Sequence, residues 1–371
     1  MKEVSFVNCK DYSKNSVYTA VKKSVDMIGG IKKFVKPKNK ILIKVNCVNN
    51  KKPEHYSVTH PEIIRAVIKL VKEAKGIPSV GDSPAGFLKI SNADATGIKK
   101  VCKEENTKII DLETSRSIKN SKNKKANKIV LAAELNNFDL IINVPKLKTH
   151  SLAVYTGAVK NLYGCVPGTI KMEYHAKFKT ENEFGDFLLD LYNTVKPKLT
   201  IMDAIVGMEG NGPVSGDPIK TRFIAASDDA LALDTAVTNF GGISSKVPII
   251  YLAKKRGWEQ ANLKKIKIIG KIKNFKLKLA DVHAHMFARF FLKYFKDLRK
   301  IILAKPYVDK DKCIKCATCA KFCPVEAITM KGYPKFDYGK CIRCYCCHEV
   351  CPADAIYLRK NWLVNLLVRR T

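Results

Sequence analysis

The sequence lacks the features that define several large classes of protein. No apolar run reaches the roughly 18 residues that a membrane span needs, so no transmembrane helix is predicted. Residues 1–8 turn polar within three positions and do not resemble a secretory signal, so we expect a cytoplasmic protein. Neither a Walker A sequence nor a G-x-G-x-x-G run after a predicted strand is present, which excludes the standard nucleotide-binding fingerprints.

Acidic residues are scarce. The chain has 34 Asp and Glu against 67 Lys and Arg, which gives a formal net charge of +33. Such a charge attracts acidic proteins, nucleic acid, anionic lipid and phosphorylated ligands. No block of lysines with interleaved aromatic residues resembles an RNA- or DNA-binding module, so nucleic acid is not the expected partner. We expect most of the lysines to form a solvated surface.

Cysteine, by contrast, is abundant, and eight of the 13 cysteines fall in two matching runs. Residues 313–324 and 341–352 share the spacing C-x2-C-x2-C-x3-C-P and begin 28 residues apart, which indicates an internal duplication. Three thiolates in a tight loop reach three irons of one cubane, and the fourth, turned away by its proline, reaches a second cluster. Zinc sites and disulfide scaffolds are alternatives. Zinc pairs, however, usually flank a longer loop, and disulfides need an oxidising compartment.

This spacing resembles that of the bacterial two-cluster ferredoxins, over residues 307–358. The resemblance implies two 4Fe–4S clusters. It assigns Cys313, Cys316, Cys319 and Cys351 to cluster one, and Cys341, Cys344, Cys347 and Cys323 to cluster two. Cys346 falls outside the pattern and is expected to be a bystander. We expect the clusters to transfer electrons, and the alternative is that they only hold the fold.

The first 280 residues alternate short β-branched runs with segments of helical periodicity. Strands are predicted at 41–45, 77–80, 138–144, 199–203, 222–226 and 264–269, and helices at 61–74, 91–104 and 229–237. This alternation predicts an α/β domain with a mostly parallel sheet. A small α+β ferredoxin-like domain with two clusters is expected to follow it.

Polar or glycine-rich stretches follow three of these strands, at 81–86, 145–150 and 204–213. Ligands bind outside the carboxyl ends of parallel strands, so these loops predict one composite pocket, with ordinary turns as the alternative. The candidates for binding an anionic small molecule are Lys146, Lys148, Thr149, Lys160, Asn161 and Asn211. The candidates for metal binding or catalytic proton transfer are Asp82, His150, Asp203 and Glu209. For each residue taken singly, a surface charge or a turn cap is the alternative.

Residues 143–150 (NVPKLKTH), 156–164 (TGAVKNLYG), 202–213 (MDAIVGMEGNGP) and 227–234 (SDDALALD) form four distinctive motifs. Together they resemble the family called domain of unknown function 362, over roughly residues 40–240. Members of that family commonly carry a ferredoxin-type pair of clusters. The resemblance therefore implies an iron–sulfur protein with an α/β domain, and it implies no particular reaction.

The domain boundaries follow from these patterns. We place the α/β domain at 1–280, a basic amphipathic helical linker at 281–306, the two-cluster domain at 307–358 and a short apolar–basic tail at 359–371. In the linker, an apolar stripe recurs at helical spacing opposite a basic face, at Phe287, Phe291, Tyr294, Leu298 and Ile301. The stripe predicts docking between the two domains, with contact to a membrane surface as the alternative. A metal-binding role for His283 and His285 is a further hypothesis.

These patterns predict an iron–sulfur oxidoreductase. Electrons from a redox partner protein would pass through the two clusters to a redox step on an anionic small molecule in the α/β domain. Two alternatives stay open: an electron carrier whose α/β domain only recognises a partner protein, and a non-redox binding protein with structural clusters. The first hypothesis requires a cluster edge near the strand-end pocket, whereas a pure carrier would expose its clusters away from it.

Overall fold

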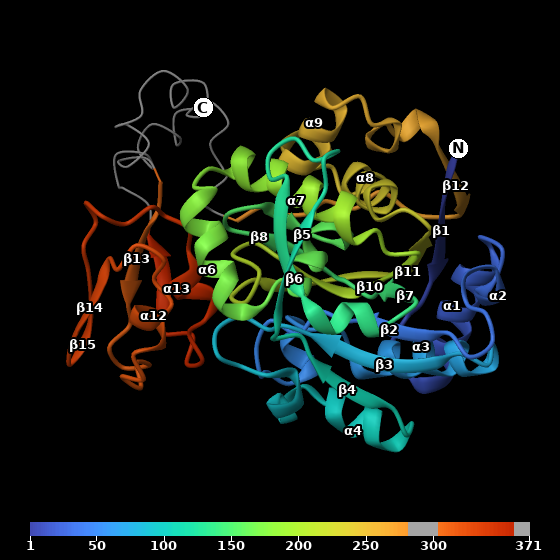
Figure 1. Cartoon of the computed structure of the whole chain (residues 1–371), viewed down its shortest axis with the longest axis horizontal. Helices are drawn as coiled ribbons and strands as arrows, with labels where there is room; N and C mark the ends of the chain where they lie inside the picture. Colours follow the sequence, from blue (N-terminus) through green and yellow to red (C-terminus); the bar gives the residue numbers. More distant parts are fainter. Residues whose placement is uncertain (281–302, 360–371) are drawn as a thin grey trace.

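The computed structural model describes residues 1–280 and 303–359, and Figure 1 shows how the elements are arranged. Residues 281–302 of the linker expected at 281–306, and residues 360–371 of the tail expected at 359–371, lie outside the described residues. The same holds for His283 and His285, so the docking, membrane and metal hypotheses for these segments stay predictions. In the described part of the chain, no helix combines the length and the apolar character that crossing a bilayer requires.

One mixed sheet forms the centre of the N-terminal domain. Its strands follow the order β12-β1-β11-β10-β7-β2-β3-β4, and β8 and β9 extend it beside β10. Strand β11 is antiparallel to both β1 and β10, whereas the pairs from β10 through β7, β2 and β3 to β4 are parallel. The predicted α/β class with a mostly parallel sheet is confirmed. The strands are β1 (Lys2–Asn8), β2 (Lys40–Lys44), β3 (Ile77–Asp82), β4 (Lys108–Asp111), β7 (Leu140–Asn143), β8 (Lys146–His150), β9 (Val154–Thr156), β10 (Leu199–Glu209), β11 (Asp217–Ser227) and β12 (Ile266–Gly270).

Helices cover both faces of this sheet, and two large apolar cores separate them from it. Successive residues of β10 point to opposite faces, so Ile201 lies in the core beneath α1 and α3, and Met202 in the core beneath α7 and α8. The helices of this domain are α1 (Lys14–Asp26), α2 (Ile31–Phe34), α3 (Pro61–Glu73), α4 (Ile98–Glu104), α5 (Ala158–Asn161), α6 (Gly168–Lys177), α7 (Glu181–Val195), α8 (Ala230–Phe240) and α9 (Pro248–Lys255).

Helix starts follow local capping chemistry. Helix α3 begins with Pro61, and the Glu62 N–H donates to His60 Nδ1 at 3.2 Å. Helix α7 begins with a capping box, in which the side chains of Thr180 and Glu183 each accept the other residue's backbone N–H at 3.0 Å. These contacts satisfy N–H groups that a helix leaves unpaired at its start.

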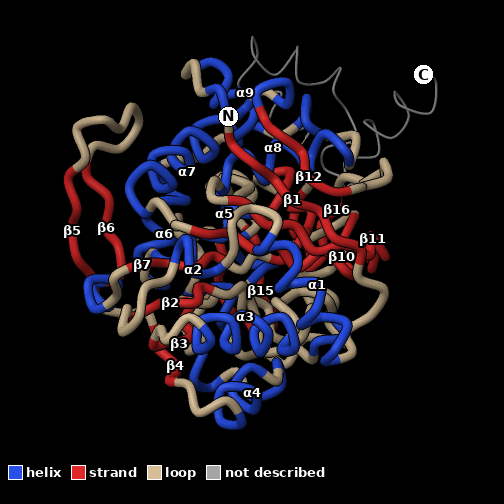
Figure 2. The backbone as a smooth tube through the Cα atoms, turned by 90° about the vertical axis from the view of Figure 1, so that its right-hand side faces the viewer, coloured by secondary structure: helices blue, strands red, loops and turns tan. Residues whose placement is uncertain are grey.

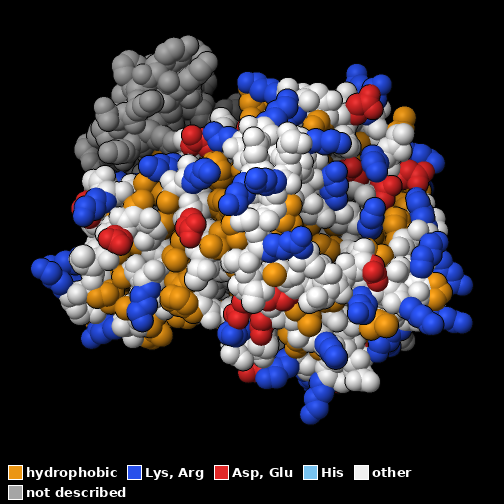
Figure 3. Space-filling model, in the orientation of Figure 1, with side chains coloured by type: hydrophobic (Ala, Val, Ile, Leu, Met, Phe, Trp, Pro, Cys, Tyr) orange, Lys and Arg blue, Asp and Glu red, His pale blue; other side chains and the backbone are white. Residues whose placement is uncertain are grey.

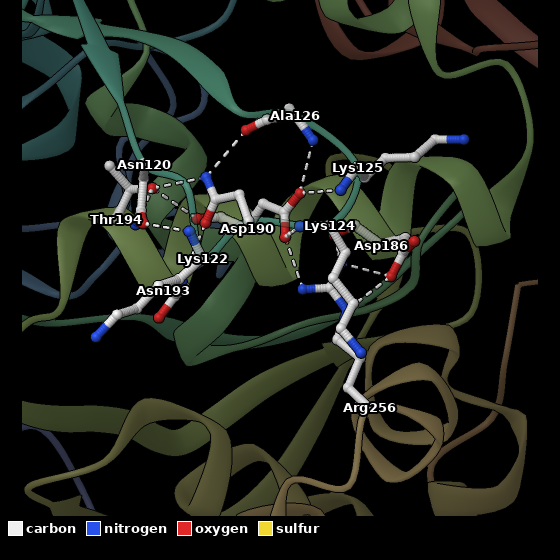
Figure 4. Close-up of polar contacts among 11 residues, drawn as sticks. Asn120, Lys122, Lys124, Lys125, Ala126, Asp186, Asp190, Asn193, Thr194 and Arg256 are labelled. Atoms are coloured by element: carbon white, nitrogen blue, oxygen red, sulfur yellow. Dashed lines mark hydrogen bonds and ion pairs between the residues drawn. The ribbon is translucent and has the colours of Figure 1, made fainter.

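A hairpin of β5 (Ser115–Lys119) and β6 (Lys128–Ala132) stands away from the main sheet (Figure 2). One buried carboxylate of α7, that of Asp190, fastens its tip (Figure 4). Asp190 accepts the backbone N–H groups of Lys124, Lys125 and Ala126 at 3.1, 2.6 and 2.7 Å. The guanidinium of Arg256 donates to the same carboxylate at 2.6 Å. Because every donor comes from the protein, this buried charge serves the fold.

The C-terminal domain is small and repeats one unit twice. Residues Lys315, Ala317 and Glu326 have positive φ, and so do Arg343, Tyr345 and Asp354, each 28 residues further on. The duplicated sequence therefore adopts a duplicated backbone, as a small α+β domain. Its elements are β13 (Lys305–Val308), α12 (Thr318–Lys321), β14 (Ile328–Lys331), β15 (Tyr333–Phe336), α13 (Cys346–Glu349) and β16 (Ile356–Arg359).

One of the three expected loops, at 145–150, is wrong because it is a strand, and the one at 204–213 is a loop only beyond Glu209. Residues 146–150 form β8, and β10 runs on to Glu209. Every residue of β8 is buried, and its polar side chains find partners inside the domain, which is why a polar sequence there does not make a loop. The helix expected at 91–104 begins only at Ile98, because Gly97 adopts the left-handed conformation with φ of 74°.

Lys and Arg side chains are spread over the face shown in Figure 3, and Asp and Glu are few on it. This distribution agrees with the solvated lysine surface that the net charge of +33 predicts.

Candidate functional site

The cysteines of the C-terminal domain gather in two groups, and each group draws on both runs. Cys313, Cys316, Cys319 and Cys351 line one small cavity. Burial raises the pKa of Cys319 to about 11, and Cys351 is among the neighbours that raise it further. The last cysteine of the second run thus lies with the triple of the first run.

The second group of cysteines is built in the same way, with the roles of the two runs exchanged. Burial raises the pKa of Cys323, and the nearby thiols of Cys344 and Cys341 raise it further. Burial and the same two thiols also raise the pKa of Cys347. The last cysteine of the first run, Cys323, therefore lies with the triple of the second run.

The donors around these sulfurs suit thiolate-bound clusters. The Ala327 and Ala355 N–H groups donate to the sulfurs of Cys323 and Cys351, both at 3.2 Å. The Thr318 hydroxyl donates to the Cys316 sulfur at 3.3 Å. Hydrogen bonds of this kind orient cluster ligands and tune cluster potentials.

A polar cavity of about 90 Å³ lies where the two domains meet. The N-terminal domain contributes the carboxyl ends of β2 and β3, together with residues of β8, β9, α5 and α6. The C-terminal domain contributes Phe322, Cys346, Glu349 and Val350, and Figure 1 shows α13 beside α6 at this junction. The rule that ligand sites lie at the carboxyl ends of parallel strands holds here. We call this space the interdomain cavity.

A buried ion pair forms part of its floor. Lys44 Nζ lies 2.7 Å from Asp82 Oδ1, and both side chains are almost fully buried. Asp82 also accepts the Cys47 N–H at 2.7 Å. A Cβ added at Gly164 would lie 2.0 Å from Asp82 Oδ1, so glycine is what allows the chain to pass this closely over the pair.

Two further lysines are held by neutral oxygens. Lys148 Nζ donates to Asn46 Oδ1 at 2.7 Å and to the Ser57 carbonyl at 2.6 Å. Lys171 Nζ donates to the carbonyls of Ser83 and Pro84. Burial lowers the pKa of each ammonium to about 7. Both groups therefore titrate close to neutral pH.

Three polar side chains of the cavity have capacity left for a ligand. Thr156 Oγ1 and His175 Nδ1 are buried, and neither has a hydrogen-bond partner. Among the described residues, the Lys160 ammonium makes no hydrogen bond or ion pair, and burial lowers its pKa. Buried polar groups are normally satisfied, so Thr156 and His175 are exceptions, and they line the same cavity as the half-buried Lys160.

His150 of the N-terminal domain contacts the C-terminal domain beside the cavity. Its Nδ1 accepts the N–H groups of Leu152 and Ala153 at 2.9 and 3.2 Å, which places the imidazole hydrogen on Nε2. His150 Nε2 lies 3.1 Å from Glu349 Oε1. Burial lowers the pKa of His150 to about 3, so the imidazole is neutral at pH 7. His150, a predicted candidate for proton transfer, is therefore not poised to exchange a proton near neutral pH.

Two more contacts hold the domains together. Lys51 Nζ lies 2.6 Å from Asp354 Oδ2. The rings of Phe87 and Phe322 meet edge to face with centroids 4.3 Å apart. A charged contact, an aromatic contact and the His150–Glu349 contact thus join the two domains, and Phe322 and Glu349 also line the cavity.

The predicted site residues divide between the cavity and other places. Asp82, Lys148, Lys160 and Asn161 line the cavity, and His150 adjoins it through Glu349. The amide of Asn161 is already used, since it donates to Asn143 Oδ1 at 2.8 Å and accepts from Asn46 Nδ2 at 2.9 Å. Asn161 therefore positions its neighbours.

The predicted grouping of Lys146 with Lys148 is wrong. Lys146 Nζ lies 2.8 Å from Asp203 Oδ2 and donates to the Tyr12 hydroxyl at 2.8 Å. Tyr12 in turn donates to Asp203 Oδ1 at 2.8 Å. A buried ammonium is most stable beside a carboxylate, and Asp203 is the register partner of Lys146 across β10 and β8.

Three other predicted residues lie outside the cavity lining. Thr149 donates to the Gly210 carbonyl at 2.8 Å, Glu209 accepts the Lys278 N–H at 2.9 Å, and Asn211 does not border the cavity. Asp82, Asp203 and Glu209 each have separate partners. In residues 1–280, no three His, Cys, Asp or Glu side chains are placed to hold a metal ion. The expected convergence of the 207–213 loop is limited to Pro213.

The sequence analysis missed Lys44, Thr156, Lys171 and His175. Lys44 is the last residue of β2 and lies one residue before the end of the strand predicted at 41–45, so the strand-end rule would have found it. Lys171 and His175 are four residues apart on α6 and therefore share a helix face, which is a weaker signal. Thr156 begins the motif at 156–164, in which Lys160 and Asn161 are the predicted site residues.

Comparisons with known proteins agree with this two-part organisation. The family model described as Domain of unknown function (DUF362) matches residues 41–239, and the 4Fe-4S binding domain matches residues 306–329 and 334–357. The thylakoid-associated protein sll1697 of Synechocystis is 35% identical over 240 residues, which cover 64% of this chain and 74% of that protein.

Two solved structures match this chain at low identity and with low TM-scores. The lactate racemase apoprotein of Thermoanaerobacterium thermosaccharolyticum is 13% identical with a TM-score of 0.38, over 60% of this chain and 53% of that one. A Thermotoga maritima protein from a structural genomics consortium is 11% identical with a TM-score of 0.33, over 53% of this chain and 51% of that one. The chain thus spans about half the length of each of these two proteins.

Proposed function

The chain belongs to the family described as Domain of unknown function (DUF362) and carries a two-repeat 4Fe-4S binding domain, and on this premise we propose its function. We propose that it is an oxidoreductase that passes electrons through two 4Fe–4S clusters to an anionic small molecule. The molecule binds in the interdomain cavity. This is the arrangement that distinguishes a redox enzyme from a pure electron carrier.

The composition of the cavity wall carries this proposal. Cys346 and Glu349 line the cavity and lie within two residues of Cys347, and Phe322, which also lines it, precedes Cys323. A molecule in the cavity would therefore lie beside the group of cysteines assigned to the second cluster. A carrier that only docks a partner protein has no need of a charged cavity closed over one of its clusters.

The ligand sets are part of the proposal. We assign Cys313, Cys316, Cys319 and Cys351 to the first cluster, and Cys341, Cys344, Cys347 and Cys323 to the second. The two groups of side chains described above support this exchange of the last cysteine between the runs. Cys346 lies outside both sets and lines the cavity.

The number of electrons that the anion accepts has to match the number that the clusters supply and the donor protein replaces. When bound, two 4Fe–4S clusters supply one electron each, so a two-electron reduction of the anion also takes up two protons. A one-electron donor protein restores the reduced state. The first cluster group suits such a contact, since Cys316 and Ile314 are exposed there, Ile314 to 64%. The nearby Lys315 favours an acidic partner.

The protein side of the reaction is to bind and orient the anion. Lys160 offers an ammonium group that no described residue contacts in an ion pair, although Glu349 lies near it, and Thr156 and His175 offer polar atoms without partners. The contacts of His150 with Glu349 and of Phe87 with Phe322 hold the two domains together beside this space. Electrostatic interactions strengthen in such a low-dielectric space.

A cytoplasmic location is proposed on the cysteine chemistry alone. Thirteen cysteines, including eight in cluster motifs, need a reducing environment. The Synechocystis relative is named as thylakoid-associated, so cell fractionation is the appropriate measurement. Recovery of this chain with membranes after a high-salt wash would overturn the cytoplasmic assignment.

The experiment purifies the full chain without oxygen and extracts small molecules for mass spectrometry. Wild type and the exposed control Lys177→Met are expected to carry an anion that Lys160→Met has lost. The extracted anion is then added to dithionite-reduced protein, and the return of the oxidised cluster absorbance is followed. We expect reoxidation with two electrons per anion.

Two outcomes contradict the proposal. A bound anion that leaves the clusters reduced would support the non-redox binder. Clusters that are reoxidised only by a protein acceptor, in a chain that retains no anion, would support the pure carrier.

A further inference from the structure

We propose that the molecule in the interdomain cavity carries two acidic groups, and that Lys148 and Lys171 take up protons when it binds. The inference rests on the proposed function in that it concerns the same cavity. It specifies the ligand class: a dicarboxylate, or a compound with one carboxylate and one phosphate.

The cavity lining contains more lysines than carboxylates, and the excess matches two negative groups. It contains four lysines and two carboxylates. Lys44 and Lys171 lie near Asp82, and Lys148 and Lys160 lie near Glu349. With all four ammonium groups protonated, each carboxylate neutralises one of its two lysines. One positive charge then stays unmatched beside each carboxylate, and two separated acidic groups would match both.

The hydrogen bonds of Lys148 and Lys171 explain why these two lysines respond to a ligand. Their acceptors are amide or carbonyl oxygens, which are polar but uncharged. A buried ammonium without a counter-ion loses its proton more readily, and it regains the proton when an anion arrives. Burial lowers the pKa of both lysines to about 7, which places this exchange at physiological pH.

Several other charged groups face the two lysines. Lys148 is faced by Lys160, Glu349, Lys146 and Asp82. Lys171 is faced by Asp82, Lys44, Cys165 and Lys160. Lys146 is neutralised by Asp203, and Asp82 is in direct contact with Lys44. Asp82 is thus already engaged by Lys44, and Glu349 is the other carboxylate that lines the cavity, so no lining carboxylate is left to neutralise the second lysine beside each of them.

Unpartnered atoms mark where one acidic group binds. Thr156 Oγ1 and His175 Nδ1 are more than nine-tenths buried, border the cavity and have no hydrogen-bond partner. Lys160 borders the same space. A carboxylate or phosphate oxygen placed among them would receive a charge and a hydroxyl donor. The second acidic group would then meet Lys171.

The pH dependence follows from the direction of proton uptake. Below pH 7 both lysines are already protonated, so affinity is constant. Above pH 7 the protonated fraction of each lysine falls about tenfold per pH unit, and the apparent affinity falls by the same factor for each lysine required. Between pH 6 and 8 we expect a loss of about tenfold for one lysine and about a hundredfold for both.

Calorimetric titration of the full chain, purified without oxygen, tests this. The probes are propionate, the dicarboxylates malonate, succinate and glutarate, and inorganic phosphate. We expect at least one dicarboxylate to bind at least about tenfold more tightly than propionate and phosphate. Repeating the titration in two buffers of different ionisation heat counts protons, and we expect about one to two taken up at pH 8 and fewer at pH 6.

The matched variants are Lys171→Met and Lys177→Met, on the same helix. Lys171→Met should lose the preference for two acidic groups and about one proton of uptake, and the exposed Lys177→Met should behave as wild type. Equal affinities for propionate and every dicarboxylate would overturn the inference, as would uptake that is unchanged in Lys171→Met. Phosphate binding as tightly as the best dicarboxylate would also overturn the inference, because one acidic group would then neutralise both unmatched lysine charges.

The two proposals fail separately. Dicarboxylate binding with the expected proton uptake, in a protein whose clusters no bound anion reoxidises, would leave this inference standing and remove the redox function. An extracted anion that reoxidises the clusters but has a single acidic group would do the reverse.

Discussion

Lys146 and Lys148 lie two residues apart on β8, yet their buried ammonium groups are held in different ways. Lys146 has a carboxylate partner, Asp203, within 2.8 Å. Lys148 has only the neutral oxygens of Asn46 and Ser57. The first arrangement stabilises a permanent charge and serves the fold. The second leaves a charge that a ligand can complete.

The Lys146–Asp203 pair should matter greatly for stability. Asp203→Asn would leave the Lys146 ammonium in the interior without a negative partner, and breaking a buried pair in this way typically costs about 3–5 kcal/mol. Denaturant unfolding of the anaerobic protein measures this. The exposed pair Lys22–Asp26 provides the control, since Asp26→Asn should change the free energy of unfolding by less than about 1 kcal/mol. Similar losses in both variants would contradict the buried-pair interpretation.

His175 should make the protein less stable in mild acid. Burial lowers its pKa to about 4, below the value of about 6.5 in the unfolded chain. Between these values the unfolded chain binds a proton that the folded chain does not, so stability is present above pH 6.5 and is lost as the pH falls.

Comparison with His175→Gln isolates this effect. From pH 7.5 to 5.5, wild type should lose about 1.4 kcal/mol more unfolding free energy than the variant, as measured in denaturant. An identical pH dependence in the two proteins would show that His175 is not buried in its neutral form.

At the scale of elements, helix α5 sets the position of Lys160. The carboxylate of Asp234 accepts the first N–H groups of this helix, from Ala158 and Val159, at 2.7 and 2.8 Å. A Cβ added at Gly157 would lie 2.2 Å from Asp234 Oδ1. The close approach of the backbone to this carboxylate therefore depends on glycine.

Gly157→Ala should displace Asp234 and with it the start of α5. We expect a loss of about 1–3 kcal/mol in unfolding free energy, together with weaker anion binding. The control is Gly257→Ala, where no atom lies within 4 Å but φ is 76°: it should also lose stability, whereas anion binding should be unchanged. Anion affinity that is unaffected by Gly157→Ala would separate α5 from the site.

The exchange of the last cysteines predicts which cluster each variant loses. Cys351→Ser should damage the cluster held by the first triple, and Cys323→Ser the cluster held by the second. Iron and sulfide analysis with electron paramagnetic resonance measures what is left. Because the second group adjoins the cavity, phosphate should alter the spectrum of Cys351→Ser and not that of Cys323→Ser. The opposite pattern would assign the cavity to the other cluster.

Elements with a strong local signal could be predicted from the sequence. The strands at 41–45 and 77–80 are buried apolar runs, and the cysteine spacing fixes a loop that few other folds share. Strand β8 could not be predicted, because its lysines, threonine and histidine resemble a loop until their buried partners are known. The pairing of Lys146 with Asp203 joins residues 57 positions apart, and no local pattern announces it.

For the whole molecule, the site depends on how the two domains meet. Four of the 24 lining residues, including Cys346 and Glu349, come from a domain that the strand-end rule does not cover. The sequence predicted a cavity at strand ends and two clusters, but only the packed structure brings them together. Contacts such as Lys51 with Asp354 are between residues 303 positions apart.

The central claim is that the interdomain cavity and the second cluster form one site. Electron–nuclear double resonance on the reduced full chain, with inorganic phosphate as the probe, tests it most directly, because the phosphorus signal reports distance from the unpaired electron. We predict a phosphorus coupling in wild type and in Lys177→Met that disappears in Lys160→Met. Intact, reducible clusters that show no phosphorus coupling at saturating phosphate, or a coupling that survives in Lys160→Met, would contradict it.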